Sequence, residues 1–178
     1  MKHFKKLLGT VTSIAIIFNF SLAVHAKDPY LDIGSKTGKI DIQSYNNKYN
    51  DIWVTIIDNG IANWNDSSAN VSISVSSKSS NTIEAARYDD SWYGLTTQRN
   101  NIFTGYSFEI QVNARTISAD ATNTSNFATS TVTHEFGHIF WLCDNPDTGE
   151  DSIMNYNRDR NTMTKPQSFD IDNVNAKY

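Results

Sequence analysis

Cysteine is almost absent from this chain: Cys143 is the only one in 178 residues. A disulfide within the chain is therefore excluded, even though an exported protein could form one. The fold has to rest on its apolar core and on any metal that it binds. Gly-rich phosphate loops, a serine nucleophile elbow and basic patches with interleaved aromatic residues are also missing, which argues against other enzyme classes.

Positive charge is scarce too, and part of it lies at the N-terminus. Three lysines within the first six residues precede an apolar segment from Leu7 to Val24, and Val24-His25-Ala26 matches a small-residue cleavage site. We therefore interpret residues 1–26 as a cleaved signal peptide. The alternative is an uncleaved membrane anchor, because the segment is about long enough to span a bilayer, but interspersed polar residues weaken its apolar character.

Cleavage would leave residues 27–178 as one acidic domain. Three of the 15 basic residues belong to the expected signal peptide and all 19 acidic residues follow it, so the formal charge of residues 27–178 is −7. A chain of this size fits a single domain. We expect a secreted, extracellular monomer that binds neither nucleic acid nor, after cleavage, a membrane.

Apolar periodicity predicts the order of the structural elements. Five strands are expected at residues 39–44, 71–75, 82–88, 91–97 and 108–112, the fourth as a short edge strand. Three helices are expected, from Tyr45 or Asn46 to about Trp64, from Asn123 or Ser125 through the paired histidines, and from about Pro166 to Tyr178. Residues 117–125 are expected to be polar and irregular. This order predicts an α+β domain.

The segment His134-Glu135-Phe136-Gly137-His138 carries the strongest functional signal. Residues four apart on a helix share one face, with Cβ atoms about 5–6 Å apart. Two imidazoles placed in this way can bind one zinc ion, at Zn–N distances of about 2.0–2.1 Å. Glu135 lies beside them and can accept a proton from a water that the metal activates. The pattern predicts a zinc peptidase, with His134 and His138 as metal ligands.

The third metal ligand cannot be a histidine of the mature chain. The two other histidines, His3 and His25, belong to the expected signal peptide, and catalytic zinc needs three protein ligands and a water. Glu150 lies in a Gly/Asp loop and is a poor candidate. Asp144 follows the motif by six residues. Cys143 stays an alternative because thiolate binds zinc well, although a packed cysteine away from the metal is the favoured interpretation.

Together these residues resemble the metzincin clan of zinc endopeptidases. The likeness rests on His-Glu-x-x-His, on an acidic residue six positions later, and on Ser152-Ile-Met-Asn-Tyr156, which is similar to the clan's Met-turn. The specific motifs cover residues 133–156. Small secreted bacterial members of the matrixin and snapalysin type are the most similar. The resemblance implies a single domain with a twisted, mixed five-stranded sheet, a long backing helix, an active-site helix and a C-terminal helix.

The resemblance also implies a role for several site residues. Asp144 would be the third zinc ligand, and Met154 would form an apolar floor under the metal. Tyr156 would act in catalysis by approaching the oxyanion of the transition state. An ordinary core methionine and a surface or core tyrosine are the alternatives. Structural calcium is common among relatives and stays open here, although the chain has no spaced calcium-binding loop.

One residue departs from the clan's pattern. Trp141 stands where the clan has the glycine that lets the helix end and the chain turn toward the third ligand. A tryptophan in the left-handed conformation costs about 1–2 kcal/mol. The turn could therefore form one or two residues later, helped by Asn145-Pro146.

The function expected from these patterns is a secreted zinc endopeptidase that hydrolyses protein or peptide substrates. An extended substrate would pair with the strand edge expected at residues 91–97. One alternative is an inactive secreted binding protein on the same fold, in which Trp141 misplaces the third ligand. A purely structural zinc is another alternative, but a structural site has no use for a base at Glu135.

Overall fold

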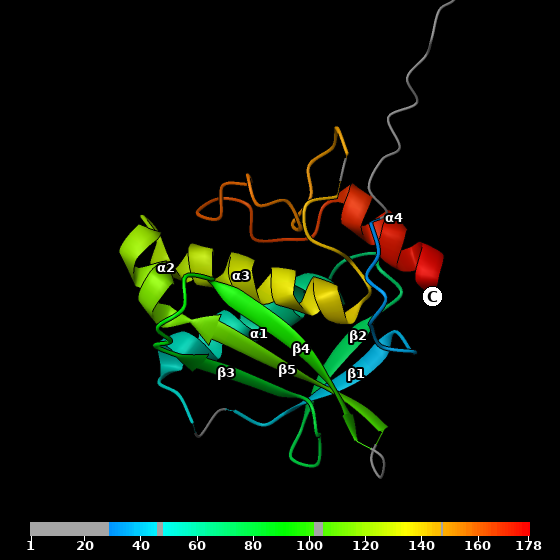
Figure 1. The fold of residues 1–178 in the computed structure, drawn as a ribbon, viewed down its shortest axis with the longest axis horizontal. Coiled ribbons are helices and arrows are strands. Elements are labelled where there is room, and N and C mark those ends of the chain that lie inside the picture. The colour runs from blue at the N-terminus through cyan, green and yellow to red at the C-terminus, as the bar shows by residue number, and fades with distance from the viewer. Residues whose placement is uncertain (1–28, 46–47, 102–104, 147) are drawn as a thin grey trace, which may run out of the picture.

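The computed structural model describes residues 29–45, 48–101, 105–146 and 148–178, so the expected signal peptide lies outside the described part (Figure 1). Its elements are β1 (Lys39–Gln43), α1 (Asp51–Asn65), β2 (Ser72–Ser76), β3 (Thr82–Ala86), β4 (Gly94–Asn101), β5 (Gly105–Asn113), α2 (Ala114–Asp120), α3 (Thr124–Ile139) and α4 (Ser168–Lys177). The α+β class expected from the sequence is confirmed. Among these described residues, no helix is long and apolar enough to cross a bilayer.

The five expected strands are present, but the expected single five-stranded sheet is wrong. β1 pairs with β2 in parallel, and a separate three-stranded sheet has the order β3-β5-β4. β5 is parallel to β3 and antiparallel to β4, so β4 lies at an edge. The two sheets meet through Asn81, which accepts a bond from the Gln43 amide at 2.8 Å and donates its side-chain amide to the Asp41 carbonyl at 2.9 Å. These bonds replace a continuous ladder between β1 and β3.

The β4 strand begins three residues later than expected, at Gly94. The preceding residues contact both α2 and the end of β5. The Thr116 hydroxyl of α2 donates to the Trp92 carbonyl at 2.9 Å, and the amide of Asn113, the last residue of β5, donates to the Tyr93 carbonyl at 2.8 Å.

Helices α1 and α3 pack closely at a glycine. A Cβ atom on Gly60 would lie 2.4 Å from Val132 Cγ1, so only glycine allows this approach. The indole of Trp64 donates to the carbonyl of Thr133 at 2.9 Å, and both tryptophan and carbonyl are buried. This contact joins α1 to the segment of α3 that precedes His134.

Two helix boundaries differ from the expectation. Helix α1 begins at Asp51, capped by the Asn50 side chain, because Tyr45 is instead buried in the core with its hydroxyl bonded to Asp58. Residues 117–120, expected to be irregular, belong to helix α2. That helix has a single buried residue, Ile117, so it shows no apolar periodicity that sequence could reveal. Of the two candidate caps of α3, Asn123 is used.

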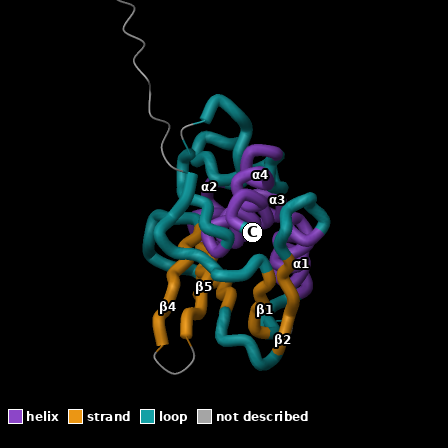
Figure 2. The backbone as a smooth tube through the Cα atoms, turned by 90° about the vertical axis from the view of Figure 1, so that its right-hand side faces the viewer, coloured by secondary structure: helices purple, strands orange, loops and turns teal. Residues whose placement is uncertain are grey.

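The layers of the fold place α3 in the middle. Figures 1 and 2 show the strands on one side of α3, and α4 with the loops that precede it on the other. The core between them is formed by apolar residues of both layers, among them Ile110, Val132 and Phe136, all completely buried. Helix α4 matches the expected C-terminal helix within two residues at its start and one at its end.

Candidate metal centre

The side chains of both histidines of the motif extend from the same face of helix α3. The imidazole rings of His134 and His138 lie 4.8 Å apart and nearly perpendicular to one another. The Nδ1 atom of His134 bonds the Ile153 carbonyl at 3.0 Å, and that of His138 bonds the Leu142 carbonyl at 2.9 Å. Because a carbonyl only accepts, each Nδ1 must carry the proton, which leaves the Nε2 lone pair of each ring available to a metal.

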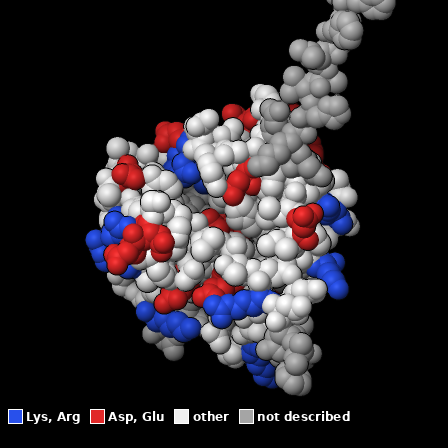
Figure 3. Space-filling view, viewed as in Figure 1, with Lys and Arg blue, Asp and Glu red and all other residues white. Residues whose placement is uncertain are grey.

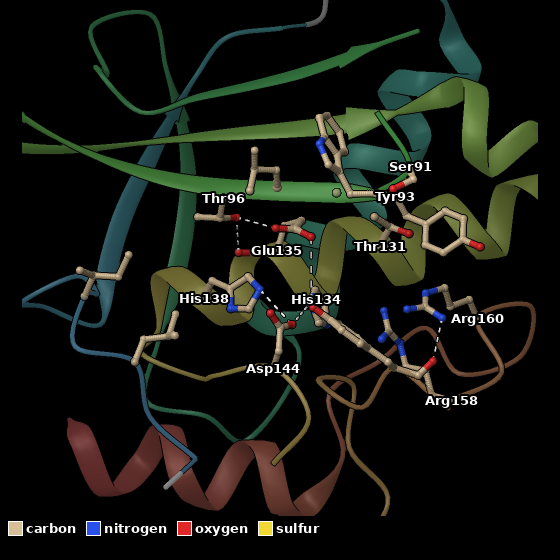
Figure 4. Close-up of a pocket in the computed structure, with 16 residues that line it drawn as sticks. Ser91, Tyr93, Thr96, Thr131, His134, Glu135, His138, Asp144, Arg158 and Arg160 are labelled. Atoms are coloured by element: carbon tan, nitrogen blue, oxygen red, sulfur yellow. Dashed lines mark hydrogen bonds and ion pairs between the residues drawn. The ribbon is translucent and has the colours of Figure 1, made fainter. Parts of the chain in front are cut away.

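Asp144 completes a three-ligand arrangement with these two rings (Figure 4). Its Oδ1 atom lies 3.0 Å from His134 Nε2 and 3.5 Å from His138 Nε2. Ligands at about 2.0–2.1 Å from a tetrahedral zinc ion lie about 3.3–3.4 Å from one another. The observed distances bracket that value, so the donor set and its spacing fit zinc.

Glu135 lies next to the three ligand atoms. Its Oε1 atom is 4.0 Å from His134 Nε2, and atoms of His134, Glu135 and His138 all lie within 4.8 Å of one another. By proximity alone Glu135 competes with Asp144 as a ligand. Asp144 is the better placed of the two, because a single Asp144 oxygen approaches both imidazoles more closely than Glu135 approaches His134.

Burial and a hydroxyl donor define the state of Glu135. The side chain is buried, which raises its pKa to about 7, although the Thr96 hydroxyl at 2.8 Å from Oε2 and the charge of His138 act in the opposite direction. A Cβ atom on Gly94 would lie 2.3 Å from Oε1, so the glycine at the start of β4 is what lets the carboxylate lie against that strand. A carboxylate with a pKa near 7 suits a general base.

The two histidines differ in charge at neutral pH. Burial lowers the pKa of His134 to about 4, so this ring is neutral and its 4.0 Å contact with Glu135 is no ion pair. Burial acts on His138 as well, but the hydrogen bond to Asp144 and the charge of Glu135 raise its pKa to about 8. For Asp144 the close contacts with the two histidines outweigh burial and lower the pKa. Metal binding must therefore displace a proton from His138.

The turn that delivers Asp144 is made by Trp141 itself, with φ of 76°. The alternative of a turn one or two residues later is wrong. The Trp141 amide donates to the His138 carbonyl at 3.1 Å, and the Leu142 amide donates to the Gly137 carbonyl at 3.0 Å. These two bonds form a Schellman motif, in which the left-handed position is normally taken by glycine. The tryptophan therefore occupies the glycine's conformation and leaves Asp144 within reach of both rings.

Contacts with distant segments hold Trp141 in that conformation. Its indole NH donates to the Ser35 carbonyl at 2.7 Å, and its own carbonyl accepts from the Leu31 amide at 2.7 Å. The Lys177 ammonium lies 5.3 Å from the ring. Gly34 packs so closely that a Cβ atom there would lie 2.4 Å from Trp141 Cδ2. These contacts offset the cost of the left-handed backbone.

The rival third ligands stay away from this point. Cys143 is buried, and its amide donates to the Pro29 carbonyl at 2.7 Å. Glu150 is exposed in the following loop. Among the described residues, the closely spaced group that could hold a metal is His134, Glu135 and His138. It contains neither rival, nor Asp144, whose place at the site rests on its distances to the two imidazoles.

The segment around Met154 packs against α3 and helps to position His134. Met154 is buried, and a Cβ atom on Gly137 would lie 2.6 Å from its sulfur. The sulfur therefore packs against α3 at Gly137, which lies between His134 and His138 in the sequence. Asp170 of α4 holds the segment: its carboxylate accepts from the Ser152 hydroxyl at 2.6 Å and from the Ile153 amide at 2.8 Å. Because the Ile153 carbonyl bonds His134, Asp170 positions that ring indirectly.

Tyr156 lies beside the ligands, as expected, although half of its surface is exposed. Its ring is 6.3 Å from that of His134. Burial of the phenol and its hydrogen bond with Asp144 raise the pKa of Tyr156 to about 12. The phenol is therefore protonated at neutral pH and able to donate a hydrogen bond near the ligands.

A cavity of about 710 Å³ opens over the site. Residues of β4, of α3 and of the loop after Met154 line it, and Figure 3 shows acidic side chains within the hollow on this face. Sequence reasoning missed four residues of the site: Thr96, Asp170, Arg158 and Arg160. Each acts through contacts with segments far away in the sequence, and no local pattern marks them.

Neither a protein-family model nor a curated protein matches the chain. Solved structures with a similar fold exist, among them a chain of the GM1-bound form of the ECX AB5 holotoxin. The similarity has a TM-score of 0.51 at 14% sequence identity, over 79% of this chain and 80% of that one. At this identity the likeness concerns the fold alone.

Proposed function

We propose that this chain is a secreted zinc endopeptidase of the metzincin type, which hydrolyses peptide bonds in protein or peptide substrates. The observation that carries the proposal is the position of Asp144, whose Oδ1 atom lies 3.0 and 3.5 Å from two imidazole nitrogens that their hydrogen bonds leave free to bind a metal. A buried carboxylate, Glu135, lies alongside.

His134, His138 and Asp144 would hold the zinc ion. When bound there, zinc would polarise a water and lower its pKa toward about 7. Glu135 would act as the general base that takes a proton from the attacking water, and would then pass that proton to the leaving amine. The Thr96 hydroxyl holds Oε2 at 2.8 Å, and Oε1 faces the histidines. Tyr156 donates its phenolic hydrogen toward the developing oxyanion.

The substrate backbone would align along β4. This strand pairs with β5 on one side only, and its residues Gly94, Leu95 and Thr96 line the cavity that contains the histidines. An extended peptide can add to such an edge by main-chain hydrogen bonds. The carbonyl to be cleaved would then lie over Glu135, which contacts the same strand through Thr96.

The alternative of an inactive binding protein depended on Trp141 misplacing the third ligand. With Trp141 in the left-handed turn, Asp144 still lies near both imidazoles. A purely structural zinc leaves unexplained why a buried carboxylate of raised pKa faces an open cavity. Both observations favour the peptidase. Calcium and the signal peptide stay predictions.

The experiment is an assay of the secreted protein against casein, with a chelator, and after restoring zinc. We expect hydrolysis that the chelator abolishes and that zinc restores. Glu135→Gln should retain zinc and lose cleavage, because the amide cannot accept the proton. Near-normal turnover by this variant would remove the general-base role, and metal-independent hydrolysis would remove the proposal as a whole.

A further inference from the structure

Two arginines from the loop after Met154 line the cavity, and the proposed reaction does not use them. Figure 4 shows Arg158 and Arg160 beside one another, on the side of His134 that faces away from His138. Arg158 is buried, with 9% of its surface exposed, and Arg160 is partly buried. Burying a charged guanidinium costs free energy unless a partner compensates for it, so the partners of both arginines are informative.

The contacts of these arginines orient them without neutralising them. Arg158 donates from Nε to the Ser130 hydroxyl at 3.1 Å and from Nη1 to the Asn155 carbonyl at 2.9 Å. Arg160 donates to the Tyr156 carbonyl at 3.0 Å, and its guanidinium lies 5.0 Å from the centre of the Tyr93 ring. These partners are a hydroxyl, carbonyls and an aromatic ring. Among the described residues, no carboxylate lies within ion-pair distance of either guanidinium.

The acidic groups of the cavity already have other partners. The Asp144 carboxylate lies 3.0 and 3.5 Å from the Nε2 atoms of the two histidines, and Glu135 accepts a hydrogen bond from Thr96. Burial lowers the pKa of Arg158 to about 9, and the neighbouring charge of Arg160 adds to this effect. The charges of Glu135, Asp170 and Asp144 act in the opposite direction without an ion-pair contact, and at neutral pH the group is charged. This end of the cavity therefore favours an anion.

We infer that the cleft selects peptides that present a carboxylate to Arg158 and Arg160. The inference rests on the proposed function, since it takes the ligand to be a peptide. The carboxylate comes either from an aspartate or glutamate side chain close to the cleaved bond or from the C-terminus of a peptide that ends there. A planar guanidinium fork is suited to bind either source by paired, charge-assisted hydrogen bonds.

The test uses one cleavable peptide in two sets of four forms, one set for each side of the cleaved bond. Within a set, the residue on that side is glutamate or glutamine, and each peptide has a free or an amidated C-terminus. We expect kcat/KM to be about tenfold higher or more for the form with the recognised carboxylate, as is typical of a hydrogen bond to a charged group. Loss of the preference on amidation identifies the C-terminus as its source, and loss on Glu-to-Gln exchange identifies the side chain.

The variant that reports on the arginines is Arg160→Gln, with Arg87→Gln as its control. Arg87 is exposed and does not line the cavity, so its variant makes the same charge change elsewhere. Arg160→Gln should reduce the preference for the carboxylate form about tenfold, and Arg87→Gln should leave it unchanged. Arg158→Gln is expected to act in the same direction, but this residue also joins α3 to the loop, and Arg160→Gln separates recognition from folding.

A second readout is independent of turnover. Labelled peptides are titrated into Glu135→Gln protein, and fluorescence anisotropy should show the same preference for the carboxylate form. Equal hydrolysis and equal binding of all forms in both sets would overturn the inference and leave the peptidase intact. Preferential binding that Arg160→Gln removes, without hydrolysis by the wild type, would overturn the peptidase but support the carboxylate site. A preference that persists in Arg160→Gln would also overturn the inference.

Discussion

Gly34 and Trp141 pack as a single unit, although 107 positions separate them in the sequence. A Cβ atom on Gly34 would lie 2.4 Å from Trp141 Cδ2 and 2.6 Å from Cγ. The indole also donates to the carbonyl of Ser35, the next residue. Trp141 makes the left-handed turn that ends α3 and leads to Asp144. The N-terminal segment therefore helps to hold Asp144, the proposed third ligand, in place.

Replacing Gly34 tests this coupling. Gly34→Val should destabilise the fold by about 1–3 kcal/mol through overpacking, and should also weaken zinc binding because the Trp141 turn shifts. Thermal unfolding and a zinc competition titration measure the two effects. Gly149→Ala is the matched control, since a Cβ atom there would meet nothing within 4 Å. Wild-type zinc affinity in a destabilised Gly34→Val protein would show that the turn holds without the N-terminal segment.

Asp170 positions the metal site from α4, through the Ile153 amide and the carbonyl that bonds His134. Asp170→Asn should weaken zinc binding by about 10–100-fold, as is typical when the partner of a metal-binding histidine is disturbed. Zinc affinity is measured by competition with a coloured chelator. Asp172→Asn, two residues along the same helix and exposed, should bind zinc like the wild type. Equal affinities for both variants would mean that Asp170 acts on stability alone.

The hydroxyl of Thr96 lowers the pKa of Glu135, against the larger effect of burial. Thr96→Val removes the hydrogen bond, so the pKa of Glu135 should rise. Because the base acts in its deprotonated form, the acidic limb of the kcat/KM profile should move to higher pH. Thr97→Val, at the exposed neighbouring position of β4, should keep the wild-type profile. An unshifted acidic limb in Thr96→Val would show that another group controls it.

Burial of Glu135 makes the stability of the metal-free protein depend on pH. Its pKa is raised from the ordinary value of 4.5 to about 7 in the folded state. The folded state then binds more protons than the unfolded state between these values, so stability falls as pH rises through this window. Glu135→Gln has no such charge to bury. Its free energy of unfolding should exceed that of the wild type by about 1–3 kcal/mol at pH 8 and by little at pH 4.

Denaturant unfolding at several pH values, with a chelator present to keep both proteins metal-free, measures this difference. Glu150→Gln, at an exposed position, is the control for removing a carboxylate. A difference between Glu135→Gln and wild type that stays constant from pH 4 to 8 would contradict the raised pKa.

Local patterns were sufficient for much of this molecule. The strands β1, β2, β3 and β5 and the helix that carries His134 and His138 follow from alternation and from four-residue spacing, because each buries one face against its neighbours. The spacing of Asp144 from His138 was readable as well, and the structure brings these residues together. Zinc binding by these residues stays a prediction.

The remaining features depend on contacts between distant segments. The turn at Trp141 is stabilised by Ser35 and Gly34, so a local rule that reserves this conformation for glycine misplaced it. The two sheets meet at Asn81, which bonds β1 by its side chain, and no local pattern indicates this contact. Asp170 has an ordinary position on an amphipathic helix, and nothing in its neighbours indicates that it reaches Ile153.

The central claim is that His134, His138 and Asp144 hold one zinc ion, and metal analysis of the purified secreted protein tests it most directly. Protein from zinc-replete medium should contain about one zinc per chain. Asp144→Ala should lose most of it, whereas Cys143→Ala should keep it. A wild-type protein that folds but contains no zinc would contradict the claim, and zinc loss in Cys143→Ala with retention in Asp144→Ala would assign the third ligand to the cysteine.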